Sequence, residues 1–130
     1  MGIFDIYTKR NLKIHHNSWF LGKYEDIDII GNRRQFSFSY YGEKTSPFFD
    51  VKGGVGFNKD TDKEGIAYKN FYATYILGPL LIMNPYLTKM FLKKLNVYDG
   101  LKFEKEAIEA YDKRLKFLQE KKDFTIGFHA

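Results

Sequence analysis

The spacing of apolar residues changes along this chain, and that change constrains the fold more than any other feature of the sequence. In the first half, apolar and polar residues alternate over short runs, as in β-strands with one buried face. In the second half, apolar residues recur every three or four positions, which is typical of amphipathic helices. This order predicts an α+β fold, an N-terminal antiparallel β-sheet covered by C-terminal helices. We expect one domain over residues 1–130, strand-rich over 1–58 and helix-rich over 66–122.

The stretch YEDIDIIGNRRQFSFSYY predicts a β-hairpin over residues 24–41 that reverses at Gly31-Asn32. A turn at this point places Ile27 opposite Phe36 on an apolar face of the hairpin. Phe36 is therefore expected to be a buried core residue. Weaker strand patterns lie outside the hairpin, at residues 2–7, 17–23 and 47–52.

The second half contains two segments whose residues predict helices. Asn84-Pro85 has the form of an N-cap followed by proline in the first turn of a helix. A longer amphipathic helix is expected over residues 102–122, where Glu109 and Lys113 form a favourable pair four positions apart. The aromatic residues between 66 and 76 also fall at helical spacing. We favour a helix there, although the same residue types could form a strand.

The composition of the chain narrows the classes of function. Because the chain contains no cysteine, it offers no disulfide, no thiolate metal site and no cysteine nucleophile. This fits a reducing compartment, and without a secretory signal pattern we expect an intracellular, cytoplasmic protein. The longest apolar run, residues 71–87, is broken by glycine and prolines, so no membrane association is expected.

The net charge of +5 is concentrated in the second half of the chain. Residues 66–130 carry eleven basic and seven acidic side chains, against ten and nine in residues 1–65. A basic surface can bind phosphates without exact spacing of its side chains. The candidate partner-binding residues are the two arginines of the hairpin and the cations of the predicted helices: Arg33, Arg34, Lys93, Lys94, Lys113, Arg114 and Lys116.

One strand also carries a partial motif. The stretch RRQFSFSYY resembles the aromatic strand signature of RNA-recognition-motif domains, with Arg34, Phe36, Phe38 and Tyr41 at its basic and aromatic positions. Gln35 stands where that signature has glycine, and no helix is predicted before the strand. The resemblance therefore covers one strand, for which a half-buried β-strand is the preferred interpretation.

The remaining motifs are incomplete. His15 and His16 are adjacent, and in a strand they would point to opposite faces, which favours surface histidines over a metal or catalytic pair. The segment DTDKEG has the opening acids of a calcium-binding loop, but Phe71 stands at the position of the closing glutamate. The glycine-rich KGGVGFNK lacks the pattern of a phosphate-binding loop. The sequence thus predicts no cofactor and no metal.

These observations favour a small non-enzymatic binding protein that engages nucleic acid or a nucleoprotein complex through a basic, aromatic-rich surface. One alternative is a small viral or mobile-element protein that acts structurally or by interaction, through self-assembly or by inhibiting a host protein machine. A protein partner or a homo-oligomer would then replace the nucleic acid. A third alternative is a hydrolase that uses His15 or His16 with a carboxylate.

Overall fold

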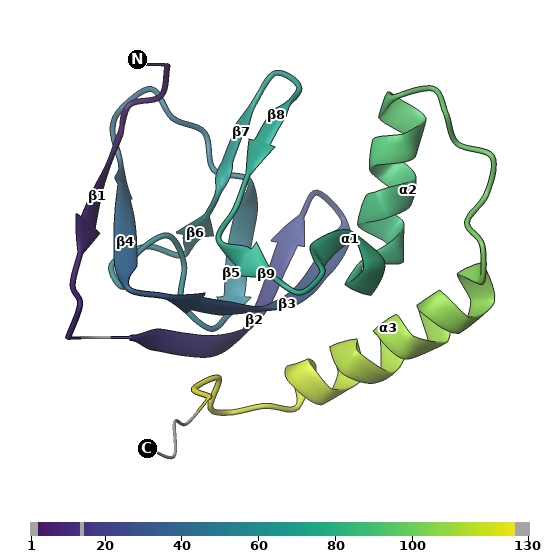
Figure 1. Ribbon diagram of the computed structural model, residues 1–130. Helices are drawn as coiled ribbons and strands as arrows, with labels where there is room; N and C mark the ends of the chain where they lie inside the picture. Colours follow the sequence, from purple (N-terminus) through teal and green to yellow (C-terminus); the bar gives the residue numbers. More distant parts are fainter. Residues whose placement is uncertain (1–2, 14, 127–130) are drawn as a thin grey trace.

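Nine strands and three helices form the part of the chain that the computed structural model describes, residues 3–13 and 15–126. The strands gather at one side of the molecule and the helices at the other (Figure 1). The strands are β1 (Ile6–Arg10), β2 (His16–Tyr24), β3 (Ile27–Gln35), β4 (Ser37–Tyr41), β5 (Phe49–Gly53), β6 (Lys63–Glu64), β7 (Ile66–Tyr68), β8 (Phe71–Ala73) and β9 (Ile76–Leu77). The helices are α1 (Leu80–Met83), α2 (Pro85–Lys94) and α3 (Glu104–Gln119). The predicted α+β class is confirmed.

The strands form three antiparallel sheets. The largest has the order β6-β5-β2-β3-β9, and the pairs β1-β4 and β7-β8 form the other two. The segment after α3 returns to the large sheet, where the backbone N–H groups of Trp19 and Ile126 donate to the carbonyls of Phe124 and Asn17. Residues more than 100 positions apart therefore lie side by side.

Two apolar clusters hold the helices on the sheet. Adjacent strand residues point to opposite faces, so β2 and β3 contribute to both clusters. One cluster joins the sheet to α2 and contains Phe20, Ile29, Phe48, Phe49, Ile76 and Leu87. The other joins it to α3 and contains Leu21, Ile30, Tyr111 and Leu118.

The predicted hairpin reversal at Gly31-Asn32 is wrong. The chain reverses at Glu25-Asp26, Tyr24 pairs with Ile27, and Gly31 lies inside β3. A Cβ atom on Gly31 would lie 2.4 Å from a side-chain carbon of Ile76, so the glycine allows β9 to approach rather than turning the chain. Strand β4 pairs with β1 instead. Phe36 is consequently 43% exposed, and its predicted burial is also wrong.

The predicted helix over residues 66–76 is wrong as well. This segment forms β7 and β8, which pair around a two-residue turn at Lys69-Asn70, and then β9. Lys69 adopts a positive φ of 54° in that turn. The aromatic and β-branched residues of this segment favour β-strands, and this preference outweighs the helical spacing of its apolar residues.

The other predicted elements correspond to elements of the structure. Helix α2 begins at Pro85 as predicted, and α3 lies inside the predicted range 102–122. Strands β2 and β5 overlap the predicted strands at 17–23 and 47–52. Strand β1 starts later than the predicted strand at 2–7, whose first residue lies outside the described part of the chain. Within the described ranges, no helix has the length and apolar character needed to cross a bilayer.

Candidate functional site

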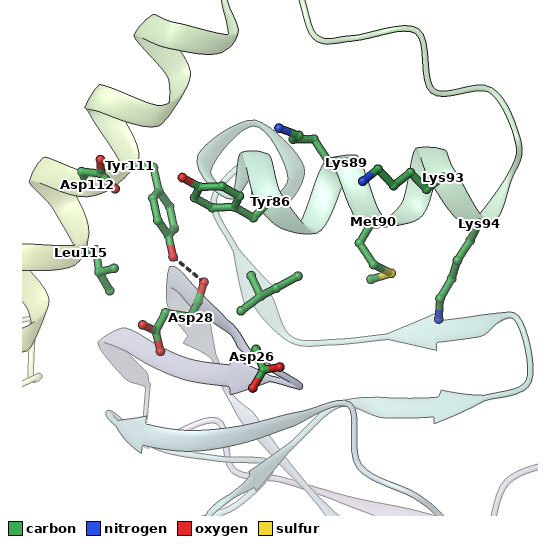
Figure 2. Close-up of a pocket in the computed structure, with 11 residues that line it drawn as sticks. Asp26, Asp28, Tyr86, Lys89, Met90, Lys93, Lys94, Tyr111, Asp112 and Leu115 are labelled. Atoms are coloured by element: carbon green, nitrogen blue, oxygen red, sulfur yellow. Dashed lines mark hydrogen bonds between the residues drawn. The ribbon is translucent and has the colours of Figure 1, made fainter.

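A groove of about 800 Å³ lies where the β2–β3 turn meets α2 and α3 (Figure 2). Its volume is within the range of pockets that hold small molecules or peptides. We call it the interhelix groove. It is lined by Asp26, Ile27, Asp28, Tyr86, Lys89, Met90, Lys93, Lys94, Tyr111, Asp112 and Leu115.

Two contacts set the position of the helices around the groove. The Tyr111 hydroxyl donates a 2.9 Å hydrogen bond to the backbone carbonyl of Asp28, which ties α3 to the turn. The rings of Tyr86 and Tyr111 meet edge to face, with centroids 5.4 Å apart. Burial raises the pKa of Tyr111, so its hydroxyl stays protonated and able to donate. Lys89 pairs with Glu104 and links α2 to the start of α3.

The charges of the groove are separated by sign. Its cations are lysines of α2, whereas its anions come from the turn and from α3, as Figure 2 shows. Lys94 donates a 2.7 Å hydrogen bond to the hydroxyl of Tyr72, and this contact lowers the pKa of Tyr72. The ion pairs between described residues do not include Asp26, Asp28 or Asp112. Among the described residues, no ion pair joins the lysines of α2 to these three aspartates.

The predicted cations do not form one surface. Lys93 and Lys94 line the interhelix groove. The three predicted cations of α3, Lys113, Arg114 and Lys116, are exposed but do not line it. Arg34 is exposed at the far end of β3, where its Nε lies 3.4 Å from the Nε2 of His15.

Arg33 is completely buried, so its guanidinium cannot contact a partner at the surface, contrary to the interpretation from the sequence. It forms a 2.6 Å ion pair with Glu64, which is also buried. The guanidinium donates further to the backbone carbonyls of Val55, Gly56 and Phe57. Its role is to hold the 52–65 loop against β3.

Glu64 completes this buried network. Its other carboxylate oxygen accepts hydrogen bonds from the Thr74 hydroxyl at 3.0 Å and from the Tyr75 amide at 2.8 Å. Burial raises the pKa of Glu64, and the charge of Arg33 opposes that shift. The glutamate of DTDKEG is therefore directed inward. Among the described residues, no group of three or more His, Asp or Glu side chains could hold a metal ion.

His16 and Ser18 form a histidine–hydroxyl hydrogen bond, with the Nε2 and Oγ atoms 3.0 Å apart. Burial, together with the charges of Arg33 and Lys59, lowers the pKa of His16. Such a pair could resemble a nucleophile and its base. Ser18 is buried, however, so a substrate would have no access to its hydroxyl. This geometry does not favour the hydrolase alternative.

A row of rings follows β4 and the residue before it. Phe38 and Tyr40 occupy alternate positions of β4 and thus share one face, and Phe36 directly precedes the strand; we call these three residues the aromatic strip. Tyr40 stacks on Tyr7 across the ladder with centroids 5.0 Å apart, and Phe36 stacks on His15 at 4.4 Å. The exposed or half-buried basic side chains close to the strip include Lys9, Arg34 and Lys59, and the buried Arg33 lies 5.9 Å from the ring centroid of Phe38.

An apolar surface lies at the other end of the molecule, around α1. Leu81, Ile82, Pro85, Leu101 and Ala107 border a small pocket of about 220 Å³, together with Thr88 and Lys102; we call the five apolar residues the apolar patch. Pro85 is buried, whereas Ile82 is 77% exposed and Leu81 45%. These exposed side chains are a candidate site of contact with another molecule.

The acidic side of the groove was not predicted from the sequence. Asp26, Asp28 and Asp112 are not among the candidate binding residues identified from the sequence. A signal was present for two of them, because Asp26 and Asp28 lie close together in the sequence. However, their position opposite the lysines of α2 depends on how the helices pack.

Comparison with known proteins gives one relative. The chain is 32% identical over 114 residues to the GatD subunit of lipid II isoglutaminyl synthase (glutamine-hydrolyzing) from Staphylococcus aureus. The matched region is 84% of this chain but 44% of the relative. The chain thus spans less than half the length of that protein. No family model matches the chain.

Proposed function

We propose that this chain is a binding component of a GatD-like, glutamine-hydrolysing assembly, in which it contacts a second polypeptide. The similarity to GatD over 84% of the chain carries this proposal. The relative is one subunit of a synthase, which supports a protein as the partner. We propose a cytoplasmic location for the assembly, which the lack of cysteine fits.

The surface of the molecule supports a protein partner. The apolar patch exposes apolar side chains from α1 and from the loop between α2 and α3. Removing such a surface from water is the main favourable term in protein association. The proposed occupant of this patch is a second polypeptide of the GatD-like assembly.

The chemistry of amide hydrolysis supports a binding role for this chain rather than a catalytic one. Covalent hydrolysis of an amide requires an activated nucleophile, most effectively a thiolate with an adjacent base. This chain has no cysteine, and its Ser18–His16 pair is inaccessible. In this proposal the nucleophile lies elsewhere in the assembly, and the residues of this chain contribute binding surface.

Purification of the tagged chain from its own cells tests this proposal. We expect an amidotransferase-related polypeptide, identified by mass spectrometry, in stoichiometric amount. We also expect ammonia release from glutamine by the complex and none by the chain alone. A chain that purifies alone, or a complex whose rate equals that of the isolated chain, would overturn the proposal.

A second candidate function is binding of single-stranded nucleic acid, and the aromatic strip favours it. In proteins that bind single strands without sequence preference, aromatic rings stack on the bases and nearby cations contact the phosphates. The aromatic strip and the cations beside it offer both kinds of group. This surface differs from the helix lysines suggested by the sequence. Of the binding residues predicted from the sequence, this surface includes only Arg34.

Fluorescence anisotropy with a labelled oligothymidine tests the second candidate. If bases stack on the strip, Phe36→Ala should weaken binding by about 1–3 kcal/mol. Affinity should also fall with salt, with a log–log slope near about −0.7 for each neutralised phosphate. Lys113→Gln, on α3, is the matched control, and equal effects of the two substitutions would exclude the strip as the site.

A further inference from the structure

We infer that the interhelix groove binds a short peptide with free ends, whose carboxylate lies toward the lysines of α2 and whose ammonium lies toward the aspartates of the turn and of α3. This inference is independent of the GatD-like assembly, because it depends only on the groove of the isolated chain.

The charges on the two sides of the groove are available to a ligand. The Nζ atom of Lys93 lies 5.5 Å from the centroid of the Tyr98 ring. Lys93, Asp26 and Asp112 are exposed, and the ion pairs between described residues include none of them. Opposite charges that line one groove without pairing favour a ligand that carries both signs.

The middle of the groove is apolar. Met90 projects into it from α2 and Leu115 lies on α3 (Figure 2). Ile27, the first residue of β3, also lines the groove. Met adapts its shape to different apolar groups, which suits side chains of varied form. The hydroxyl of Tyr111 is already used by the Asp28 carbonyl, so the charged groups at the two sides provide the remaining polar anchors.

The size of the groove favours a peptide over a single amino acid. A volume of about 800 Å³ is near the upper part of the range for small-molecule pockets. A single amino acid would leave most of this space filled by water. A short peptide can extend from the lysines to the aspartates and place its side chains over the apolar floor.

Titration of the isolated chain with tetra-alanine, followed by backbone amide NMR, tests the inference. We expect saturable shifts at the turn, α2 and α3, and little effect from tetra-alanine with acetylated and amidated ends. Lys93→Gln and Asp112→Asn should each weaken binding about three- to fivefold, because exposed ion pairs contribute modestly. Lys113→Gln, which lies on α3 outside the groove, should bind like the parent.

The outcomes separate clearly. All of these substitutions are at exposed positions, so circular dichroism should confirm an unchanged fold in each variant. Lack of saturation at millimolar peptide, equal binding of the blocked peptide, or unchanged affinity in both groove variants would each overturn the inference. None of these results would bear on whether the chain joins a second polypeptide.

Discussion

At the scale of single residues, the buried pair Arg33–Glu64 is the feature with the largest expected energetic effect. Glu64→Gln leaves the Arg33 charge buried without its counterion, and breaking such a pair costs about 3–5 kcal/mol. Urea denaturation measures the loss. The double variant Arg33→Met/Glu64→Met should lose clearly less than the two single losses added together, because both charges are removed at once. A Glu64→Gln loss below about 1 kcal/mol would mean that the pair does not hold the loop.

His16 gives the fold a pH dependence of known sign. Its pKa in the folded chain is lowered from 6.5, so the unfolded chain binds a proton more readily. Its contribution therefore favours folding above about pH 6.5 and is lost as the pH falls below that value. We expect the parent to lose more stability than His16→Gln between pH 7.5 and pH 5.5, as measured by urea midpoints. The raised pKa of Glu64 makes stability rise as the pH falls, but this contribution is the same in the parent and in His16→Gln. Equal losses in the two proteins would contradict this assignment.

At the scale of elements, Asn84 lies at the predicted N-cap position, but its side chain bonds to a strand instead of the helix. It stands at the N-cap of α2 as predicted, yet its side chain makes no capping bond. Its amide instead bonds to both the N–H and the carbonyl of Ile30, each at 2.8 Å, and thereby occupies the edge of β3. Asn84→Ala leaves these two buried groups unpaired and should cost about 2–4 kcal/mol. Thermal unfolding measures the cost, and Thr88→Val, which removes a hydroxyl from the same helix, is the smaller control.

The errors in the strand predictions also have a physical cause at this scale. Gly-Asn is a good turn sequence, but glycine also permits close approach of a neighbouring strand, and only the tertiary structure distinguishes these uses. The observed reversal at Glu25-Asp26 requires a positive φ of 52° at Glu25, which its sequence does not favour. Helix α3, by contrast, could be predicted because its apolar stripe and charge pairs lie within one segment.

At the scale of the whole molecule, the class of fold could be predicted from the sequence but the candidate sites could not. The change in apolar spacing follows from local periodicity, which the sequence displays directly. The interhelix groove, the aromatic strip and the apolar patch depend on pairings between distant segments, such as β1 with β4 and the Phe124 segment with β2. Charge counting identified cations such as Arg33 but could not reveal that one of them is buried with its counterion.

The central claim is that the apolar patch on this molecule docks a second polypeptide of a GatD-like assembly. The most direct measurement compares how much of that polypeptide is captured by the tagged parent, by Ile82→Asp and by Leu12→Asp. Leu12 is the matched control, because it is 69% exposed and lies on the loop after β1. We predict that a carboxylate at position 82 reduces capture at least about tenfold, since it places an unpaired charge in an apolar interface, whereas Leu12→Asp captures as much as the parent. Equal capture by all three proteins would contradict the account.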